Sequence, residues 1–178
     1  SRFSRAARSV ANAVVEHWIA IRRDFHPEMF SPLDNGMYGA IGGGMYFLSE
    51  MIASEPDPYY VMGLDSLIFA SKNSIEQCGS ADIIGGHAGL LQSLRAVRSV
   101  VDDQLLEEVR GLAIRAFSLI ADGMVKEEGG IGWHSSSDGR SLLGYSHGAA
   151  GIAAGLACGY SAFEDEAKQV LDIHTVVD

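Results

Sequence analysis

The sequence predicts an all-α fold: a partial α/α toroid of about three helical hairpins plus one further helix. Apolar residues recur every three or four positions along most of the 178 residues, which is typical of amphipathic helices. A short glycine motif that opens an apolar helix occurs three times along the chain. The alternation typical of strands is not evident, apart from a short extended piece expected near 131–133. Together these observations favour repeated helix pairs.

Three long helices with a wide polar face are expected at 3–21, 58–79 and 102–124. The first is indicated by the helical spacing of Phe3, Ala7, Val10, Val14, Trp18 and Ile21. The second follows Asp57-Pro58, a capping residue before a proline suited to the first helical position. Their polar faces predict that these helices form an outer layer.

Three glycine-opened helices are expected at 39–54, 86–101 and from His147 to about residue 160. They carry few charges, so they need burial on most sides and are expected to form an inner layer. A last helix is expected to open with a capping box, Ser161 and Glu164, and to run to Leu171. Such an arc leaves apolar edges, which predicts self-association.

The three glycine motifs align on Gly39, Gly86 and Gly148, and each has a second glycine three residues later. Four residues before these positions lie Asn35, Asp82 and Gly144, so the polar residue differs between copies. Variable loops on a regular frame are where proteins place their sites. We expect these loops to meet around a shared cavity.

The third motif places His147 directly before Gly148, at the start of an apolar helix. A helix start gathers unpaired N–H groups and the positive end of the helix dipole, which disfavours imidazolium. His147 is therefore predicted to stay neutral near pH 7 and to act as an acid or a base. The alternative is that this histidine only caps a buried helix.

Composition excludes several classes of function. The formal charge of −10 argues against a nucleic-acid partner, since phosphate binding requires clustered Lys and Arg, but it is compatible with a peptide substrate. No apolar run reaches the length that spans a membrane. Cys78 and Cys158, the only two cysteines, have no metal-ligand spacing and suggest no oxidising compartment. A cytoplasmic protein fits best.

The chain resembles the lanthionine synthetase C-like cyclase family. The resemblance is carried by the three glycine repeats, by the stretch 81–89 and above all by 143–153, Leu-Gly-Tyr-Ser-His-Gly-Ala-Ala-Gly-Ile-Ala. This last motif is most similar to the cyclase domain of bifunctional class II lanthipeptide synthetases. The family fold is an α/α toroid. Its members add a cysteine thiol of a precursor peptide to dehydroalanine or dehydrobutyrine, which closes a thioether ring.

The resemblance implies roles for two residues. His147 matches the active-site histidine of the family, and Asp82 matches its active-site aspartate, which can orient an imidazole. The attacking thiolate is activated by zinc in the family, and a neutral histidine suits proton transfer in the addition. For Asp82 the alternative is a turn residue at the start of a helix.

The sequence departs from the family at the zinc site. The family ligands are two cysteines and a histidine, with an adjacent Cys-His pair, and they follow the His-Gly motif; this chain has no such pair. We therefore expect residues 1–178 to be part of a single toroid domain that lacks its C-terminal repeats. The zinc is expected in the full-length parent, and the isolated fragment is expected to be inactive with no metal site of its own.

Further residues are candidate substrate contacts: Tyr145, His87 and Trp133. His87 is more typical of a packed or capping residue, whereas Trp133 lies in the long loop before His147. Two other functions stay open. One is a non-catalytic peptide-binding module of the same fold. The other is a glycoside hydrolase, which would need paired carboxylates such as Asp34 and Asp82 and would leave the His-Gly motif without a role.

Overall fold

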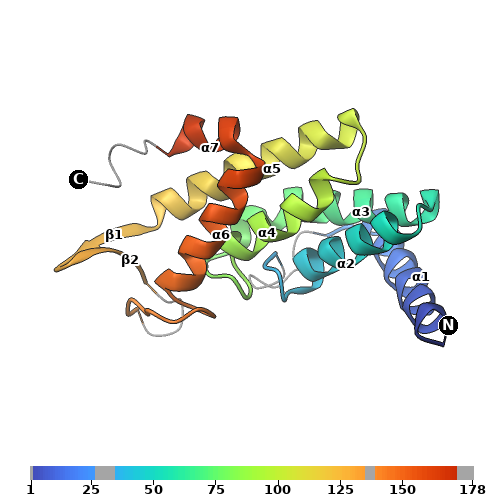
Figure 1. Cartoon of the computed structure of the whole chain (residues 1–178), viewed down its shortest axis with the longest axis horizontal. Coiled ribbons are helices and arrows are strands. Elements are labelled where there is room, and N and C mark those ends of the chain that lie inside the picture. Colours follow the sequence, from blue (N-terminus) through green and yellow to red (C-terminus); the bar gives the residue numbers. More distant parts are fainter. Residues whose placement is uncertain (1, 27–34, 135–138, 172–178) are drawn as a thin grey trace.

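The computed structural model describes residues 2–26, 35–134 and 139–171, and these are predominantly α-helical (Figure 1). Seven α-helices lie within these ranges: α1 (Arg2–Arg23), α2 (Ala40–Ser54), α3 (Pro58–Ser74), α4 (His87–Arg98), α5 (Asp103–Asp122), α6 (Ala149–Ala162) and α7 (Glu164–Val170). A 3-10 turn, η2 (Ile75–Gln77), extends α3. The predicted all-α fold is confirmed, and the predicted helices appear at the expected places.

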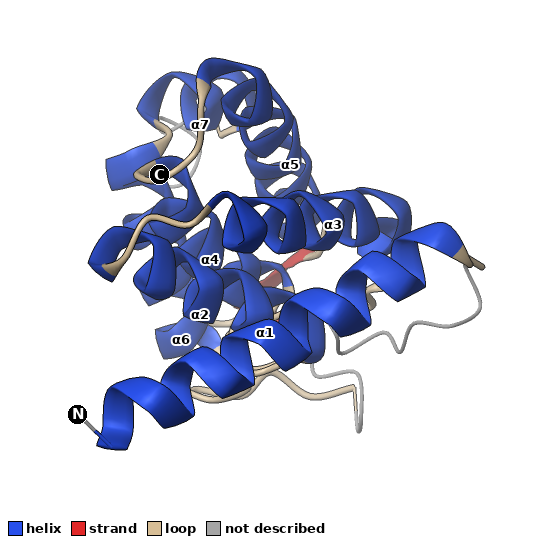
Figure 2. Cartoon of the chain, turned by 90° about the vertical axis from the view of Figure 1, so that its right-hand side faces the viewer, coloured by secondary structure: helices blue, strands red, loops and turns tan. Residues whose placement is uncertain are grey.

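The helices form two layers. The charge-poor helices α2, α4 and α6 lie side by side, with α4 in the middle (Figure 1), while α1 crosses the front of the molecule in Figure 2. The outer helices follow one another as α1, α3, α5 and α7, and each inner helix also contacts the next helix of the chain. The described helices thus form three pairs, α2/α3, α4/α5 and α6/α7, and α1 is an additional helix that packs on α3. This arrangement is consistent with part of an α/α toroid.

The apolar core lies between the layers. Large side chains with less than 2% exposure come from both layers and include Leu48, Leu67, Leu91 and Phe117. Helix α6 lies so close to α4 that a Cβ on Gly155 would collide with the backbone and side chain of Ala88. Small residues in α6 therefore allow backbone contact that a larger side chain would prevent. Among the described residues, no helix is long and apolar enough to cross a membrane.

A small β-hairpin follows α5 and corrects one expectation. The strands β1 (Met124–Glu127) and β2 (Gly130–Trp133) pair antiparallel, with Met124 opposite Trp133 and Glu127 opposite Gly130. The extended piece predicted near 131–133 is present, but Met124 belongs to its partner strand and not to the preceding helix. The turn depends on Gly129, whose φ of +114° suits a residue without a side chain.

The helix caps agree with the sequence in two cases and differ in one. Asp57 accepts a hydrogen bond from the Tyr59 N–H at the start of α3, and Asp102 likewise caps α5. The capping box predicted for the last helix is wrong. Ser161 lies in the last turn of α6 and its hydroxyl donates to Cys158 O, while α7 begins after Phe163 without a side-chain cap. The small-residue pattern of α6 continues to Ala162, so Ser161 belongs to α6 and does not cap α7.

Candidate active site

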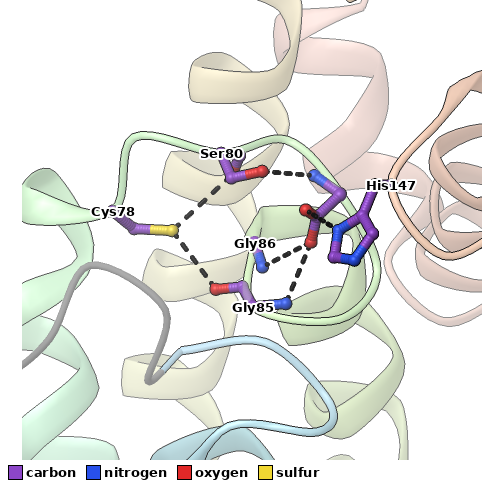
Figure 3. Close-up of polar contacts among 6 residues, drawn as sticks. Cys78, Ser80, Gly85, Gly86 and His147 are labelled. Carbon is purple, nitrogen blue, oxygen red and sulfur yellow. Dashed lines mark hydrogen bonds and ion pairs between the residues drawn. The ribbon is translucent and has the colours of Figure 1, made fainter. Parts of the chain in front are cut away.

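The loops before α4 and α6 bring Asp82 and His147 together, although 65 residues separate them in the sequence. The ring Nδ1 of His147 lies 2.8 Å from Asp82 Oδ2 (Figure 3). Asp82 belongs to the α4 loop (78–86), and His147 ends the α6 loop (139–148). The structure therefore joins the two residues that the sequence marks as acid–base candidates, in one hydrogen-bonded pair.

The other carboxylate oxygen of Asp82 is held by its own loop. Oδ1 accepts hydrogen bonds from the N–H groups of Gly85 (2.9 Å) and Gly86 (3.2 Å). Burial alone raises the pKa of Asp82, but hydrogen bonds from His147 and the Gly85 N–H outweigh it, so the pKa is lowered. Asp82 is therefore ionised at neutral pH. It is both a turn residue and the partner of His147.

The pair is buried on one side and accessible on the other. The side chain of Asp82 is 10% exposed, whereas that of His147 is 55% exposed. With Nδ1 on Asp82, the ring presents Nε2 to the outside, and no described residue hydrogen-bonds to it. A buried carboxylate that orients an accessible imidazole suits proton transfer to a bound molecule.

Both loops fold back onto the helices that they precede. In the α4 loop, the His87 N–H donates to Ser80 O at 3.1 Å; in the α6 loop, the Ala149 N–H donates to Leu142 O at 2.8 Å. The first N–H groups of these helices are thus paired, which corrects the expectation that they are unpaired. The contact requires glycine, because a Cβ on Gly151 would fall on the carbonyl oxygen of Tyr145.

The α2 loop, of which residues 35–39 are described, uses the position equivalent to Asp82 differently. Asn35 is fully buried, where its Nδ2 donates to Ser74 Oγ (3.0 Å) and its Oδ1 accepts from Ser71 Oγ (2.7 Å). This amide ties its loop to α3. Asp82 occupies the same place in the α4 loop, where one oxygen is left for His147. Of the aligned residues Asn35, Asp82 and Gly144, only Asp82 places a side-chain polar group within hydrogen-bond distance of His147.

The remaining predicted contacts lie in different surroundings. Tyr145 is 55% exposed and shares the α6 loop with His147. His87 is 3% exposed and its Nε2 lies 3.3 Å from Ile75 O, so its ring is not part of the pair. Trp133 is half-buried, and its Nε1 donates to Ile120 O on α5 at 2.8 Å. Asp34, the second carboxylate considered for a glycoside hydrolase, lies outside the described residues.

Asp82 is held by Gly85, Gly86 and Ser80, none of which was expected to be a site residue. The Ser80 hydroxyl accepts from the Asp82 N–H at 3.2 Å, beside the two glycine N–H groups already described. An aspartate followed three and four residues later by glycine is typical of a turn in which the side chain binds the backbone. This spacing was the signal available in the sequence.

A groove of about 630 Å³ lies along the inner helices, lined by residues that include Met37, Tyr46, Arg95 and Cys158. Neither Asp82 nor His147 lines it. The α2 and α4 loops nevertheless meet, because the Gly36 N–H donates to Gly85 O at 3.0 Å. The glycine-opened helices thus converge at their loops, and the groove lies farther along α4 toward its C-terminus.

Comparison with known families agrees with this geometry. The family model described as lanthionine synthetase C-like protein matches residues 20–176. The chain belongs to this family. The match includes all three glycine motifs and both members of the Asp82–His147 pair. Searches of the curated proteins and of the solved structures gave no significant match.

The described residues do not fit the zinc site that the family resemblance implies. Among them, no group of three or more His, Cys, Asp or Glu side chains is placed so that it could hold a metal ion. Cys78 is buried in the α4 loop, and Cys158 lies on α6, where the Arg95 guanidinium approaches its sulfur at 3.6 Å. We therefore derive no step through a metal ion for this chain.

Proposed function

We propose that this chain is the N-terminal part of a cyclase domain that forms thioether rings in a precursor peptide, similar to that of class II lanthipeptide synthetases. The observation that carries the proposal is the Asp82–His147 hydrogen bond of 2.8 Å, which joins two repeats of a lanthionine synthetase C-like chain. The family supports a peptide substrate, and the accessible face of His147 supports contact with one.

The proposed reaction adds a cysteine thiol of the peptide to the β-carbon of a dehydrated residue. The new C–S bond forms as the C=C π pair moves toward the α-carbon and its carbonyl, which gives an enolate. The thiol loses one proton and the α-carbon gains one, so a single proton carrier can serve both steps. His147 Nε2 is the group proposed for this transfer, and Asp82 keeps the ring oriented through Nδ1.

The rest of the domain is proposed to supply the zinc ligands. In this proposal, zinc ligands lie in C-terminal repeats beyond residue 178, as the order of motifs in the family implies. Residues 1–178 alone are then expected to leave dehydrated peptide uncyclised. We place the reaction in the cytoplasm, in keeping with the cysteine usage of the sequence.

The test is ring formation by the intact cyclase that contains this chain. The protein is incubated with dehydrated precursor peptide, and the free thiols left in the peptide are counted. His147→Asn is expected to slow the loss of thiols by about 10²–10⁴-fold, the usual contribution of acid–base catalysis. His17→Asn, on the exposed face of α1, is the matched control and is expected to keep full activity.

Two outcomes would overturn the proposal. Full activity of His147→Asn would remove this histidine from the reaction. A wild-type protein that binds the peptide but leaves every thiol free would instead identify a non-catalytic peptide-binding module.

We also propose that the isolated chain self-associates through the two ends of its helical arc. At one end, α1 exposes Val10 (54%) beside a groove of about 420 Å³. At the other, α6 exposes Ala150, Ala153 and Ala157. Sedimentation velocity should show oligomers whose share grows with concentration; a monomer at every concentration would contradict this proposal.

A further inference from the structure

The buried thiol of Cys78 lies at the start of the α4 loop (78–86), which also carries Asp82. Cys78 is 5% exposed, and its Sγ lies 3.6 Å from Ser80 O and 3.5 Å from Gly85 O (Figure 3). Burial raises the pKa of this thiol and outweighs the lowering by a hydrogen bond with the Ser80 backbone, and the charge of Asp82 raises the pKa further. The thiol therefore keeps its hydrogen at neutral pH and acts as a donor shared between the two carbonyls.

One of these carbonyls is rigidly linked to the hydrogen bonds of Asp82. The Gly85 C=O and the Gly86 N–H belong to the same planar trans peptide unit and point in opposite directions. The oxygen faces Cys78 Sγ and also accepts from the Gly36 N–H, while the Gly86 N–H donates to Asp82 Oδ1 at 3.2 Å. A rotation of this unit away from Cys78 would also turn the N–H away from Asp82.

The second carbonyl lies at the other end of the same loop. Ser80 O accepts from the His87 N–H at 3.1 Å, and the Ser80 hydroxyl accepts from the Asp82 N–H at 3.2 Å. The thiol of Cys78 thus connects the segment before Asp82 with the segment after it. The part of the loop between these contacts contains the carboxylate that binds His147.

We propose that Cys78 is a positioning residue for the Asp82–His147 pair, because its thiol hydrogen fixes the peptide unit that holds Asp82 Oδ1 and leaves Oδ2 for His147. This role rests on the proposed function, in which the Asp82–His147 pair is catalytic. The effect on Asp82 itself needs no turnover and is measured in the 178-residue chain without substrate.

The first test is the pKa of Asp82, followed by ¹³C NMR of its carboxyl group. Cys78→Ala is expected to raise this pKa by roughly 0.5–1 unit, because the N–H groups of Gly85 and Gly86 are then held less firmly. Cys78→Ser retains a donor and is expected to restore most of the difference. Cys158→Ala, on α6, is the matched control and should leave the pKa of Asp82 unchanged. An unchanged pKa in folded Cys78→Ala would overturn the proposal.

A second measurement keeps the proposal testable if Cys78→Ala does not fold. In Cys158→Ala the only thiol is Cys78, so its S–H stretching band is observed alone by infrared spectroscopy. A band shifted to lower frequency than that of a free thiol is expected from a hydrogen-bonded donor. A band at the free-thiol position would show that the thiol does not hold the loop.

The intact cyclase gives the last readout. Cys78→Ala is expected to lower kcat by about tenfold with little change in KM, as when a group behind an active residue is removed, and Cys78→Ser should recover most of it. A loss confined to KM would contradict a positioning role. If the wild-type cyclase forms no rings, the proposed function fails, whereas the pKa of Asp82 still decides the role of Cys78.

Discussion

The loops before α4 and α6 are built alike, yet they place their histidines in opposite environments. In each loop, carbonyl oxygens accept hydrogen bonds from the first N–H groups of the following helix, and each loop packs against a glycine of that helix. His87, the first residue of α4, is 3% exposed, with Nε2 near Ile75 O. His147, two residues before α6, has a side chain that is 55% exposed and bound to Asp82.

The position of the histidine relative to the N-cap glycine accounts for the difference. His87 follows Gly86 and lies inside the first turn of α4, so its side chain packs against the preceding element. His147 precedes Gly148, where the chain is still extended, and its side chain projects beyond the helix end. A shift of two residues relative to the N-cap glycine separates a core histidine from the histidine of the candidate site.

The largest effect is expected from a change that breaks the loop–helix contact itself. Gly151→Ala would force a Cβ onto the carbonyl oxygen of Tyr145, so we expect the free energy of unfolding to fall by about 4–5 kcal/mol. Gly111→Ala is the control, since nothing lies within 4 Å of its added Cβ on α5, and it should stabilise the chain by about 0.5–1 kcal/mol. Urea denaturation measures both. Equal stabilities of the two variants would contradict the close approach.

Removal of His87 should lower the free energy of unfolding more than removal of His147. His87→Ala empties a buried site and removes one of two hydrogen-bond partners of Ile75 O, which still accepts from the Cys78 N–H, so we expect a loss of about 2–3 kcal/mol in the free energy of unfolding. His147→Ala removes a half-exposed side chain and should cost under about 1 kcal/mol. Thermal and urea unfolding of both variants tests the order. If His147→Ala were the more destabilising change, the contrast between the loops would fail.

The helical frame could be predicted from the sequence because its signals are local. Apolar spacing, the cap at Asp57 and the repeated glycines each act within one turn of a helix, and all three were confirmed. The errors arose where local signals compete. Ser161 matches a capping box but is used by α6, and Met124 fits the end of a helix but pairs with Trp133 across the hairpin.

The site could be predicted only in part. The aligned glycine motifs and the family resemblance pointed to Asp82 and His147. In the structure these two residues are hydrogen-bonded to each other. Their shared environment is a tertiary property, because the contact depends on how α4 and α6 pack. The role of the Gly85–Gly86 peptide and of Cys78 depends on the direction of backbone carbonyls, which no residue type encodes.

The smallest effect is a pH dependence that separates the two loops. Burial lowers the pKa of His87, so the folded chain binds this proton more weakly than the unfolded chain does. The associated stability is complete above about pH 6.5 and declines as the pH falls below it, by at most about 1.4 kcal/mol per pH unit. The lowered pKa of Asp82 has the same sign, but its contribution is complete above about pH 4 and is lost below that.

Urea unfolding between pH 8 and pH 3 should therefore show His87→Gln diverging from wild type near pH 6 and Asp82→Asn only near pH 4. Parallel curves for wild type and His87→Gln from pH 7.5 to pH 5 would mean that burial does not lower the pKa of His87, and the contrast between a buried and an exposed histidine would then be lost.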